Sequence, residues 1–216
     1  RSTLFPYTTL FRSPYSVKYV IARYVMRHSS TIRVVSEPLR KLVSTRWRID
    51  ANKIAVAPVG VNFTAVASHD KAPHKRWLAP GLESQKIVLF VGRLCEQKNL
   101  TLWVQVAAAV NDRVQGVSFV VVGSGELEEA VRQHVEAIGL IDRFLFLGAR
   151  KHEELPTIYA AADVFLLTSH YEGFGRVILE AMLASVPVVA TMCSGPEDLI
   201  ADAYMEIGRA SSRERV

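Results

Sequence analysis

The 216-residue sequence has only two cysteines, Cys95 and Cys193. Two widely separated cysteines fit no common metal-ligand spacing and cannot make the disulfide framework of a small secreted domain. The sequence also has no apolar run as long as a membrane span, and it does not begin with the charged start and unbroken apolar run of a signal peptide. These absences favour a reducing compartment, and we expect a cytoplasmic protein.

The formal net charge of +5 is unevenly distributed along the chain. Residues 14–50 have eight Lys and Arg against two acidic residues, whereas residues 86–205 have nine against fifteen. A basic segment followed by an acidic one, without a zinc-finger or RNA-recognition motif, argues against a nucleic-acid-binding module. The basic helix expected near residues 15–28 could contact anionic lipid head groups as a peripheral membrane anchor, or could simply face solvent.

The two ends of the sequence resemble neither regular secondary structure nor a targeting signal. Residues 3–13 can be back-translated into a DNA string that resembles a common short-read sequencing adapter. Residues 206–216 match a translation of its reverse complement except at Ser212. We therefore expect residues 1–13 and 206–216 to be adapter-derived, and the part between them to be a fragment of a longer protein.

From Lys86 onward, short apolar runs alternate with longer amphipathic segments. The runs predict strands over residues 86–92, 116–123, 143–148, 163–169 and 186–191. The segments between them predict helices over about 99–111, 126–138, 152–162 and 175–185. This alternation predicts an α/β fold with a Rossmann-like, doubly wound parallel sheet, in which ligands bind outside the carboxyl ends of the strands.

The upstream part predicts a smaller second unit, residues 14–61. Its pattern is an amphipathic helix, a strand ending at Ser36 and Glu37, another helix, and a strand over 53–61. Residues 62–85 contain Pro73, Pro80 and Gly81 among polar residues and predict a linker between the two units.

Two cations follow the first predicted strand of the larger unit. Arg93 and Lys98 lie in the loop "GRLCEQKN", which leads into a helix. Together with free backbone N–H groups at a helix N-terminus, two cations form a site for an anionic group such as a diphosphate. Surface cations near helix starts are also common, so this motif alone does not decide the function.

The second strand ends in the glycine-containing turn "VVVGSGELEE". Gly123 and Gly125 allow a tight turn and a close approach of the backbone to a ligand. The dehydrogenase fingerprint needs a third glycine at position 128, where this chain has Glu128. The turn therefore argues against nicotinamide binding.

The strongest local signal, "TSHYEGFGRVILEAM", follows the fourth strand. Gly173 and Gly175 flank Phe174 directly before a helix, so backbone N–H groups can face a phosphate or sugar oxygen. Glu172 precedes the helix and Glu180 lies on it. Two carboxylates at this edge suit a ligand with two polyol groups. The alternative is that Glu172 is a charge at the helix start and Glu180 faces solvent.

Taken in order, these stretches resemble the retaining, metal-independent glycosyltransferases of group one (family four), which have the GT-B architecture of two facing Rossmann-like domains. The matching stretches run from about residue 32 to residue 200 and include "VGRLCEQKN", "VVVGSGELEEAVRQ" and "YEGFGRVILEAM". The resemblance implies that residues 86–205 are a truncated donor-binding domain. It also implies that residues 14–61 are a remnant of the N-terminal, acceptor-side domain.

The resemblance also implies roles for single residues. Arg93 and Lys98 would clamp the donor diphosphate and Glu172 would contact hydroxyls of the transferred sugar. The backbone of residues 173–175 would lie near the sugar and phosphate, and Glu180 would hold the ribose. The expected partners are a nucleotide-sugar donor and a sugar or lipid-linked glycan acceptor, with no nucleic acid, no metal and no cofactor beyond the donor.

Several residues depart from the family pattern. Arg176 stands where relatives have an apolar residue, and could contact phosphate or reach solvent. Ser185 replaces a helix-ending glycine, which predicts a strained turn. Glu197 lies in a divergent stretch and is not assigned a role, and His170 is not given the role of the family's acceptor-side histidine.

Two alternative functions remain open from the sequence. One is a nucleotide-sugar epimerase of the same architecture, and the other is a non-catalytic module that binds sugar nucleotides. Because the acceptor side is expected to be incomplete, we expect this chain to bind a nucleotide or nucleotide-sugar weakly and not to transfer the sugar.

Overall fold

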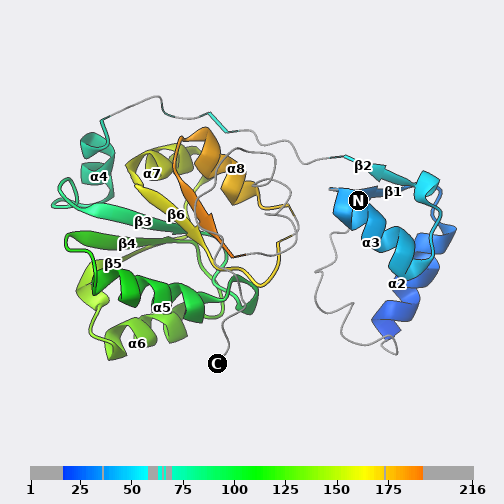
Figure 1. Ribbon diagram of the computed structural model, residues 1–216, viewed down its shortest axis with the longest axis horizontal. Helices are drawn as coiled ribbons and strands as arrows, with labels where there is room; N and C mark the ends of the chain where they lie inside the picture. Colours follow the sequence, from blue (N-terminus) through cyan, green and yellow to red (C-terminus); the bar gives the residue numbers. More distant parts are fainter. Residues whose placement is uncertain are drawn as a thin grey trace. The chain divides into compact units, whose positions relative to one another are not determined.

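The computed structural model describes residues 17–35, 37–57, 63, 64, 66, 70–172 and 174–191 (Figure 1). The ends expected to be adapter-derived lie outside the described residues, as do Gly173, Cys193 and Glu197. The chain divides into two compact units between Gly60 and Val61.

The first unit contains a parallel βαβ arrangement preceded by a helix. Its elements are α2 (Val17–His28), β1 (Ile32–Val34), α3 (Glu37–Trp47), the 3-10 helix η1 (Ala51–Lys53) and β2 (Ile54–Val56). Strands β1 and β2 pair in parallel, with Ile32 opposite Ile54. Trp47 and Val43 of α3 pack with Val34 and Ile54 in a small apolar core.

The second unit is built on a five-stranded parallel sheet in the order β5-β4-β3-β6-β7 (Figure 1). The strands are β3 (Lys86–Val91), β4 (Val117–Val122), β5 (Phe144–Gly148), β6 (Val164–Leu167) and β7 (Val188–Ala190). This sheet confirms the predicted α/β class and the Rossmann-like arrangement. The strand order reverses between β3 and β6, which is where open parallel sheets bind ligands.

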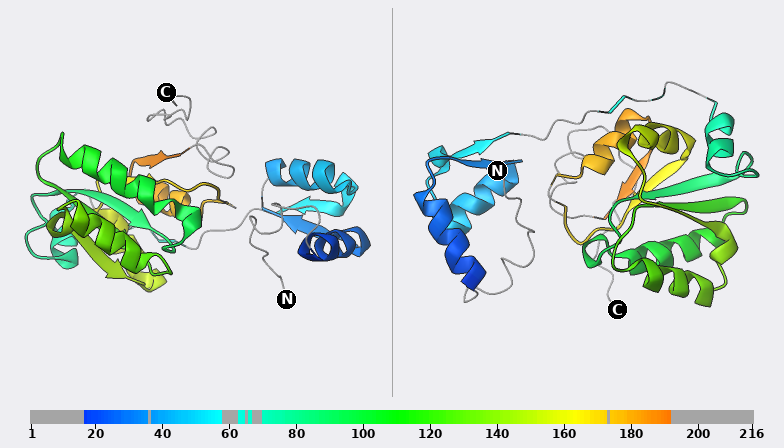
Figure 2. Two further views of the ribbon diagram at one scale, coloured as in Figure 1. Left: turned by 90° about the horizontal axis from the view of Figure 1, so that it is seen from below. Right: turned by 180° about the vertical axis from the view of Figure 1, so that it is seen from behind.

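Helices cover both faces of this sheet (Figures 1 and 2). They are α5 (Leu100–Asn111) and α6 (Glu128–Ala137) on one face, and α7 (Leu155–Ala161) and α8 (Arg176–Leu183) on the other. The short 3-10 helices η2 (Glu96–Lys98), η3 (Ile141–Arg143) and η4 (His152–Glu154) lie in connecting segments. The α5 face has an aromatic core in which Trp103 packs edge-on against Phe90, Phe119 and Phe144.

The stretch predicted as a linker contains a helix that the sequence analysis missed. Helix α4 (Ala72–Leu78) packs against α7 and contributes Leu78 to the core. Pro73, which indicates a loop in the sequence, lies in the first turn of α4, where proline is compatible with a helix. Residues 70–85 therefore pack on the larger unit.

A buried ion pair connects α4 to the sheet. The Nζ of Lys75 donates to Oδ2 of Asp163 at 2.8 Å and to the carbonyl of Gln85 at 2.7 Å. The same Oδ2 accepts from the N–H of Ile87, at 2.9 Å, and Lys71 lies 3.5 Å from Oδ1. Because the Lys75 side chain is buried, these bonds are needed to satisfy its charge.

We expect Asp163→Asn to lower the unfolding free energy by about 2 kcal/mol at pH 7, because the buried ammonium of Lys75 then has no carboxylate partner. Urea unfolding at several pH values measures this effect. Glu83→Gln, which removes the acidic partner of the exposed Arg76, is the control and should change stability little. A loss no larger than that of Glu83→Gln would contradict the structural role of Asp163.

The same ion pair predicts a pH dependence. Burial by itself raises the pKa of Asp163, but the hydrogen bonds from Lys75 and Ile87 and the charges of Lys75 and Lys71 outweigh it, so the pKa is lowered. A carboxyl with a lowered pKa contributes stability that is present above its unfolded pKa of about 4 and is lost as the pH falls through the folded-state pKa. The difference between the wild type and Asp163→Asn should therefore shrink below about pH 4.

Helix α8 ends in a turn that places Ser185 in the left-handed region, at φ 57°. The N–H of Ser185 donates to the carbonyl of Met182, and the N–H of Val186 donates to that of Ala181, both at 2.9 Å. This is the Schellman pattern, whose left-handed position is usually glycine. The structure therefore agrees with the strained turn that the sequence predicts.

Ser185→Gly should raise the unfolding free energy by about 1 kcal/mol, because relief of the left-handed strain exceeds the greater unfolded-state entropy of glycine. Thermal unfolding would show this as a higher Tm. Ser84→Gly, in an exposed turn without a positive φ, is the control and should give no gain. An unchanged or lower Tm for Ser185→Gly would show that the turn is not strained.

Candidate functional site

Two loops meet at the carboxyl ends of β3 and β6, where the strand order reverses. The hydroxyl of Thr168 donates to the carbonyls of Lys98 and Asn99, at 3.0 and 3.1 Å. The N–H of His170 donates to the carbonyl of Gln97, and the side-chain amide of Gln97 donates to the carbonyl of Tyr171, both at 2.9 Å. These bonds fix the two loops against each other.

Lys98 and Glu172, both predicted site residues, meet between these loops. The Nζ of Lys98 lies 2.5 Å from Oε1 of Glu172, and the two side chains are only 11% and 9% exposed. The hydroxyl of Ser169 donates to the same carboxylate oxygen at 2.6 Å. A cation and an anion are therefore held in position at the edge of the sheet by groups from both loops.

Gly92 provides the room in which the Lys98 side chain crosses the end of β3. A Cβ at Gly92 would lie 3.2 Å from Cε and 3.6 Å from Nζ of Lys98. Gly92, Thr168 and Ser169 are not among the site residues that the sequence predicts. They lie at the carboxyl ends of the predicted strands 86–92 and 163–169, and this position is the signal that could have identified them.

Arg93 lies beside this pair on the β3 loop but is mostly exposed. Its side chain is 74% exposed, and Nη2 lies 3.4 Å from Oε2 of Glu126, which is also exposed. An exposed pair at this distance contributes little energy, so the guanidinium is available to an incoming anion. The site thus has one nearly buried, ion-paired cation and one exposed cation.

Gly123 and Gly125 bring a third loop into contact with the β3 loop. A Cβ on Gly123 would lie 1.9 Å from the carbonyl oxygen of Gly92, and one on Gly125 would lie 2.2 Å from that of Leu94. The N–H of Leu94 also donates to the carbonyl of Ser124, at 3.0 Å. Close packing of backbone against backbone is therefore one reason for these glycines, and it places the third loop next to Arg93.

The start of α8 agrees with the glycine-rich turn expected there. Gly175 has φ 73°, in the left-handed region, and its carbonyl accepts the N–H of Ile178 at 2.9 Å. Phe174 is half-buried, and Gly173 lies outside the described residues. Arg176 has an exposed side chain whose Nη2 lies 3.7 Å from Oε1 of Glu180.

Glu180 is buried, contrary to the alternative that it faces solvent. Its side chain is 5% exposed, and Oε2 accepts the hydroxyl of Tyr159 at 3.1 Å. Burial of Tyr159, and then the charge and hydrogen bond of Glu180, raise the pKa of the tyrosine well above its ordinary value. Tyr159 therefore remains a hydrogen-bond donor at every physiological pH.

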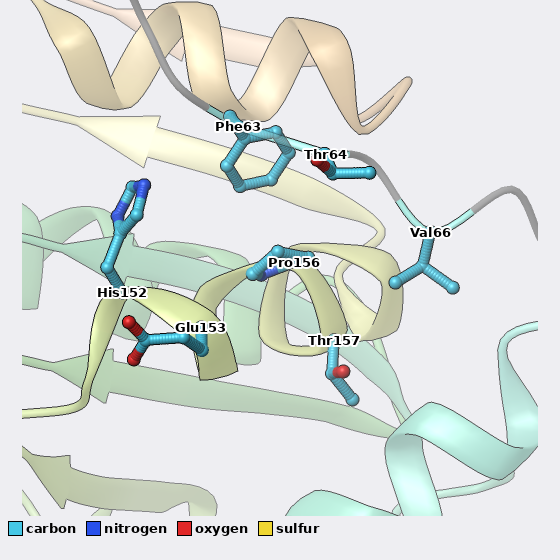
Figure 3. A pocket seen from close by; sticks show the side chains of 7 residues that line it. All are labelled: Phe63, Thr64, Val66, His152, Glu153, Pro156 and Thr157. Atoms are coloured by element: carbon cyan, nitrogen blue, oxygen red, sulfur yellow. The ribbon is translucent and has the colours of Figure 1, made fainter.

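A separate hollow of about 440 Å³ lies beside the start of α7 (Figure 3). The chain around Phe63 forms one side, and residues of η4 and α7 form the other. Its lining residues are Phe63, Thr64, Val66, His152, Glu153, Pro156 and Thr157. None of the predicted site residues lines it.

The described residues contain neither a cluster of metal ligands nor a membrane-spanning helix. In this part of the chain, no three or more His, Cys, Asp or Glu side chains form a group that could hold a metal ion. No helix within the same residues is long and apolar enough to cross a membrane.

The sequence matches the family of glycosyl transferases group 1 over residues 77–210. It is 35% identical to the 2-deoxystreptamine N-acetyl-D-glucosaminyltransferase of Niallia circulans over 69% of this chain and 39% of that protein. It is 34% identical to the D-inositol 3-phosphate glycosyltransferase of Segniliparus rotundus over 72% of this chain and 35% of that protein. The chain thus spans well under half the length of these two relatives.

Two solved structures illustrate the similarity in fold. The structure of Anabaena Alr3699/HepE in complex with UDP and glucose has a TM-score of 0.74 and 26% identity, over 87% of this chain and 52% of that one. WaaG, a glycosyltransferase involved in lipopolysaccharide biosynthesis, has a TM-score of 0.75 over 91% of this chain and 54% of that one. Its 20% identity supports the fold alone.

Proposed function

This chain belongs to the group 1 glycosyl transferases, and from that premise we propose that its larger unit binds a nucleotide-sugar donor. The whole protein would then transfer the sugar to a hydroxyl acceptor. The observation that carries this proposal is the Lys98–Glu172 pair at the point where the strand order of the sheet reverses, with the exposed Arg93 on the same loop as Lys98. The transferase names of the relatives do not favour the epimerase alternative.

The charges at this site suit cleavage of a sugar–diphosphate bond. Breaking the anomeric bond places negative charge on the departing nucleoside diphosphate. We propose that Lys98 and Arg93 stabilise this charge, so that no metal is required. When Lys98 pairs with the diphosphate in place of Glu172, the Glu172 carboxylate can accept hydrogen bonds from hydroxyls of the transferred sugar.

The remaining predicted residues would complete the donor site. We propose that backbone groups of residues 173–175 lie near the sugar and phosphate, and that Gly123 and Gly125 bring their loop close to the diphosphate. Glu180 would accept hydrogen bonds from the ribose. Two observations support this arrangement. These residues follow strands at the carboxyl edge of the sheet, and the carboxylate of Glu180 is buried.

Calorimetric titration with nucleoside diphosphates tests donor binding directly. UDP is the first probe because the similar Anabaena structure is in complex with UDP. GDP and ADP then show which base the site prefers. We expect one diphosphate to bind at least tenfold more tightly than its monophosphate, since the second phosphate adds charge facing Lys98 and Arg93. Failure of all three diphosphates to bind would overturn the proposal.

Transfer itself is a proposal for the whole protein. We propose that it occurs with retention of anomeric configuration onto a sugar or lipid-linked glycan, and that this chain alone binds the donor without transfer. Product NMR on a full-length enzyme distinguishes the alternatives: an epimerase isomerises the donor without acceptor, and a binding module produces nothing. An inverted anomeric product would contradict retention.

We further propose a cytoplasmic protein that contacts the membrane peripherally through α2. Four apolar side chains of this helix are more than half exposed: Val20, Ile21, Tyr24 and Val25. Arg23 and Arg27 add positive charge. Cosedimentation with anionic vesicles, but not with neutral vesicles, is expected, and equal recovery from both would contradict charge-assisted contact.

We also propose that residues 1–13 and 206–216 derive from sequencing adapters. The support is their match to opposite strands of one DNA string. Sequencing the source DNA across codons 13/14 and 205/206 tests this origin. Genomic sequence at both positions would refute it.

A further inference from the structure

We propose that Tyr159 is a positioning residue that orients Glu180 toward the ribose, and so gives the donor site its preference for nucleotides with ribose hydroxyls. This inference rests on the proposed function. It adds a role for a residue that lies on α7 rather than in any of the loops at the edge of the sheet.

The tyrosine ring is held rigidly in the core. Tyr159 is fully buried, and its ring packs edge-on against Phe63 at 5.6 Å and at a tilt against Phe165 at 5.8 Å, measured between ring centroids. These contacts involve the ring alone, so phenylalanine would preserve them. The hydroxyl is the polar end of a side chain inside an apolar cluster, and burying it is unfavourable unless it is hydrogen-bonded.

The hydroxyl has one proton and two nearby acceptors. Oε2 of Glu180 lies at 3.1 Å and the carbonyl of Val177 lies at 3.3 Å. The carboxylate is both nearer and charged, so it is the stronger acceptor. The bond links α7 to α8 and restricts rotation of the Glu180 carboxylate.

Because of this bond, the two carboxylate oxygens of Glu180 have different environments. Oε2 accepts the hydrogen bond from Tyr159, whereas Oε1 lies 3.7 Å from Nη2 of Arg176. Arg176 is half exposed, so Oε1 lies next to a side chain that reaches solvent, whereas Glu180 itself is only 5% exposed. In this proposal Oε1 accepts the hydrogen bond from the ligand hydroxyl, and the bond from Tyr159 to Oε2 fixes the orientation of the carboxylate.

The experiment compares two ligands that differ only in the ribose. Binding of UDP and of 2′,3′-dideoxyuridine diphosphate is measured by calorimetry for the wild type, Tyr159→Phe and Glu180→Ala. If GDP or ADP binds more tightly than UDP, that base replaces uracil in both ligands. The measured quantity is the ratio of the two affinities, which a general loss of stability does not alter.

We expect the wild type to prefer the ribose form and Tyr159→Phe to lower its affinity for UDP about tenfold while leaving the dideoxy affinity unchanged. Glu180→Ala should remove the preference. Phe165→Leu, which alters a neighbour of the tyrosine ring but leaves the hydroxyl, is the matched control and should lower the Tm without changing the ratio.

An unchanged ratio in Tyr159→Phe, with the preference lost in Glu180→Ala, would overturn the role of Tyr159 while leaving the donor site in place. Equal binding of both ligands by the wild type would overturn the ribose role of Glu180 and this inference together. Absence of all nucleoside diphosphate binding would instead refute the proposed function itself.

Discussion

Lys98→Met is expected to lower the affinity of the chain for its nucleoside diphosphate at least a hundredfold. The Lys98 ammonium is largely shielded from water, and a charge-assisted contact to phosphate in such a place contributes about 2–3 kcal/mol. Calorimetric titration measures the loss. Lys86→Met, which removes an exposed lysine from the amino end of β3, is the control and should bind normally.

The same variant should also be less stable by about 3 kcal/mol, because Glu172 remains in a nearly buried position without its cation. Adding Glu172→Gln removes the unpaired charge and should restore much of the stability, but not the binding. The double variant thus separates the two roles of Lys98. Retention of diphosphate affinity within about threefold in Lys98→Met would contradict the proposed site.

Gly125→Ala is expected to lower the unfolding free energy by about 3 kcal/mol or more, and to abolish diphosphate binding with it. The added Cβ would lie 2.2 Å from the carbonyl oxygen of Leu94, which is backbone and cannot rotate away. The two loops must separate, and the β3 loop that holds Arg93 and Lys98 must move. Chemical denaturation and calorimetry measure the two losses.

Gly139→Ala provides the matched control for this effect. Gly139 has φ 73° but nothing within 4 Å of an added Cβ, so the substitution adds backbone strain without a clash. It should cost only about 1 kcal/mol and leave binding unchanged. Similar losses in the two variants would show that contact between the loops is not the reason for Gly125.

The sequence predicted the architecture of the larger unit because its strands are short apolar runs separated by amphipathic helices. Each of the five predicted strands overlaps a strand of the sheet. The 62–85 stretch was harder to predict. Pro73 indicates a loop or a first helical turn equally well, and only the packing of α4 on α7 distinguishes them.

The composition of the site was predictable, but its pairing was not. Arg93, Lys98 and Glu172 could be selected because each follows an apolar strand. Lys98 can reach Glu172 because β3 and β6 are adjacent in the sheet. The order of strands in a sheet cannot be predicted from the local residue pattern.

The sequence pattern does indicate that Glu180 is buried. It lies three residues after Val177 and four before Ala184, both of which pack against the core, so helical spacing places it on the apolar face. Its bond to Tyr159 joins residues 21 positions apart, and no local spacing indicates it.

We propose that a nucleoside diphosphate binds at the carboxyl ends of β3 and β6, where the strand order reverses. Amide chemical-shift mapping of the chain with the tightest-binding of UDP, GDP and ADP tests it most directly. We predict that the largest shifts fall in residues 92–99 and 168–176, with smaller ones near Glu180. Shifts confined to the hollow around Phe63 and His152, or to residues 17–57, would contradict it.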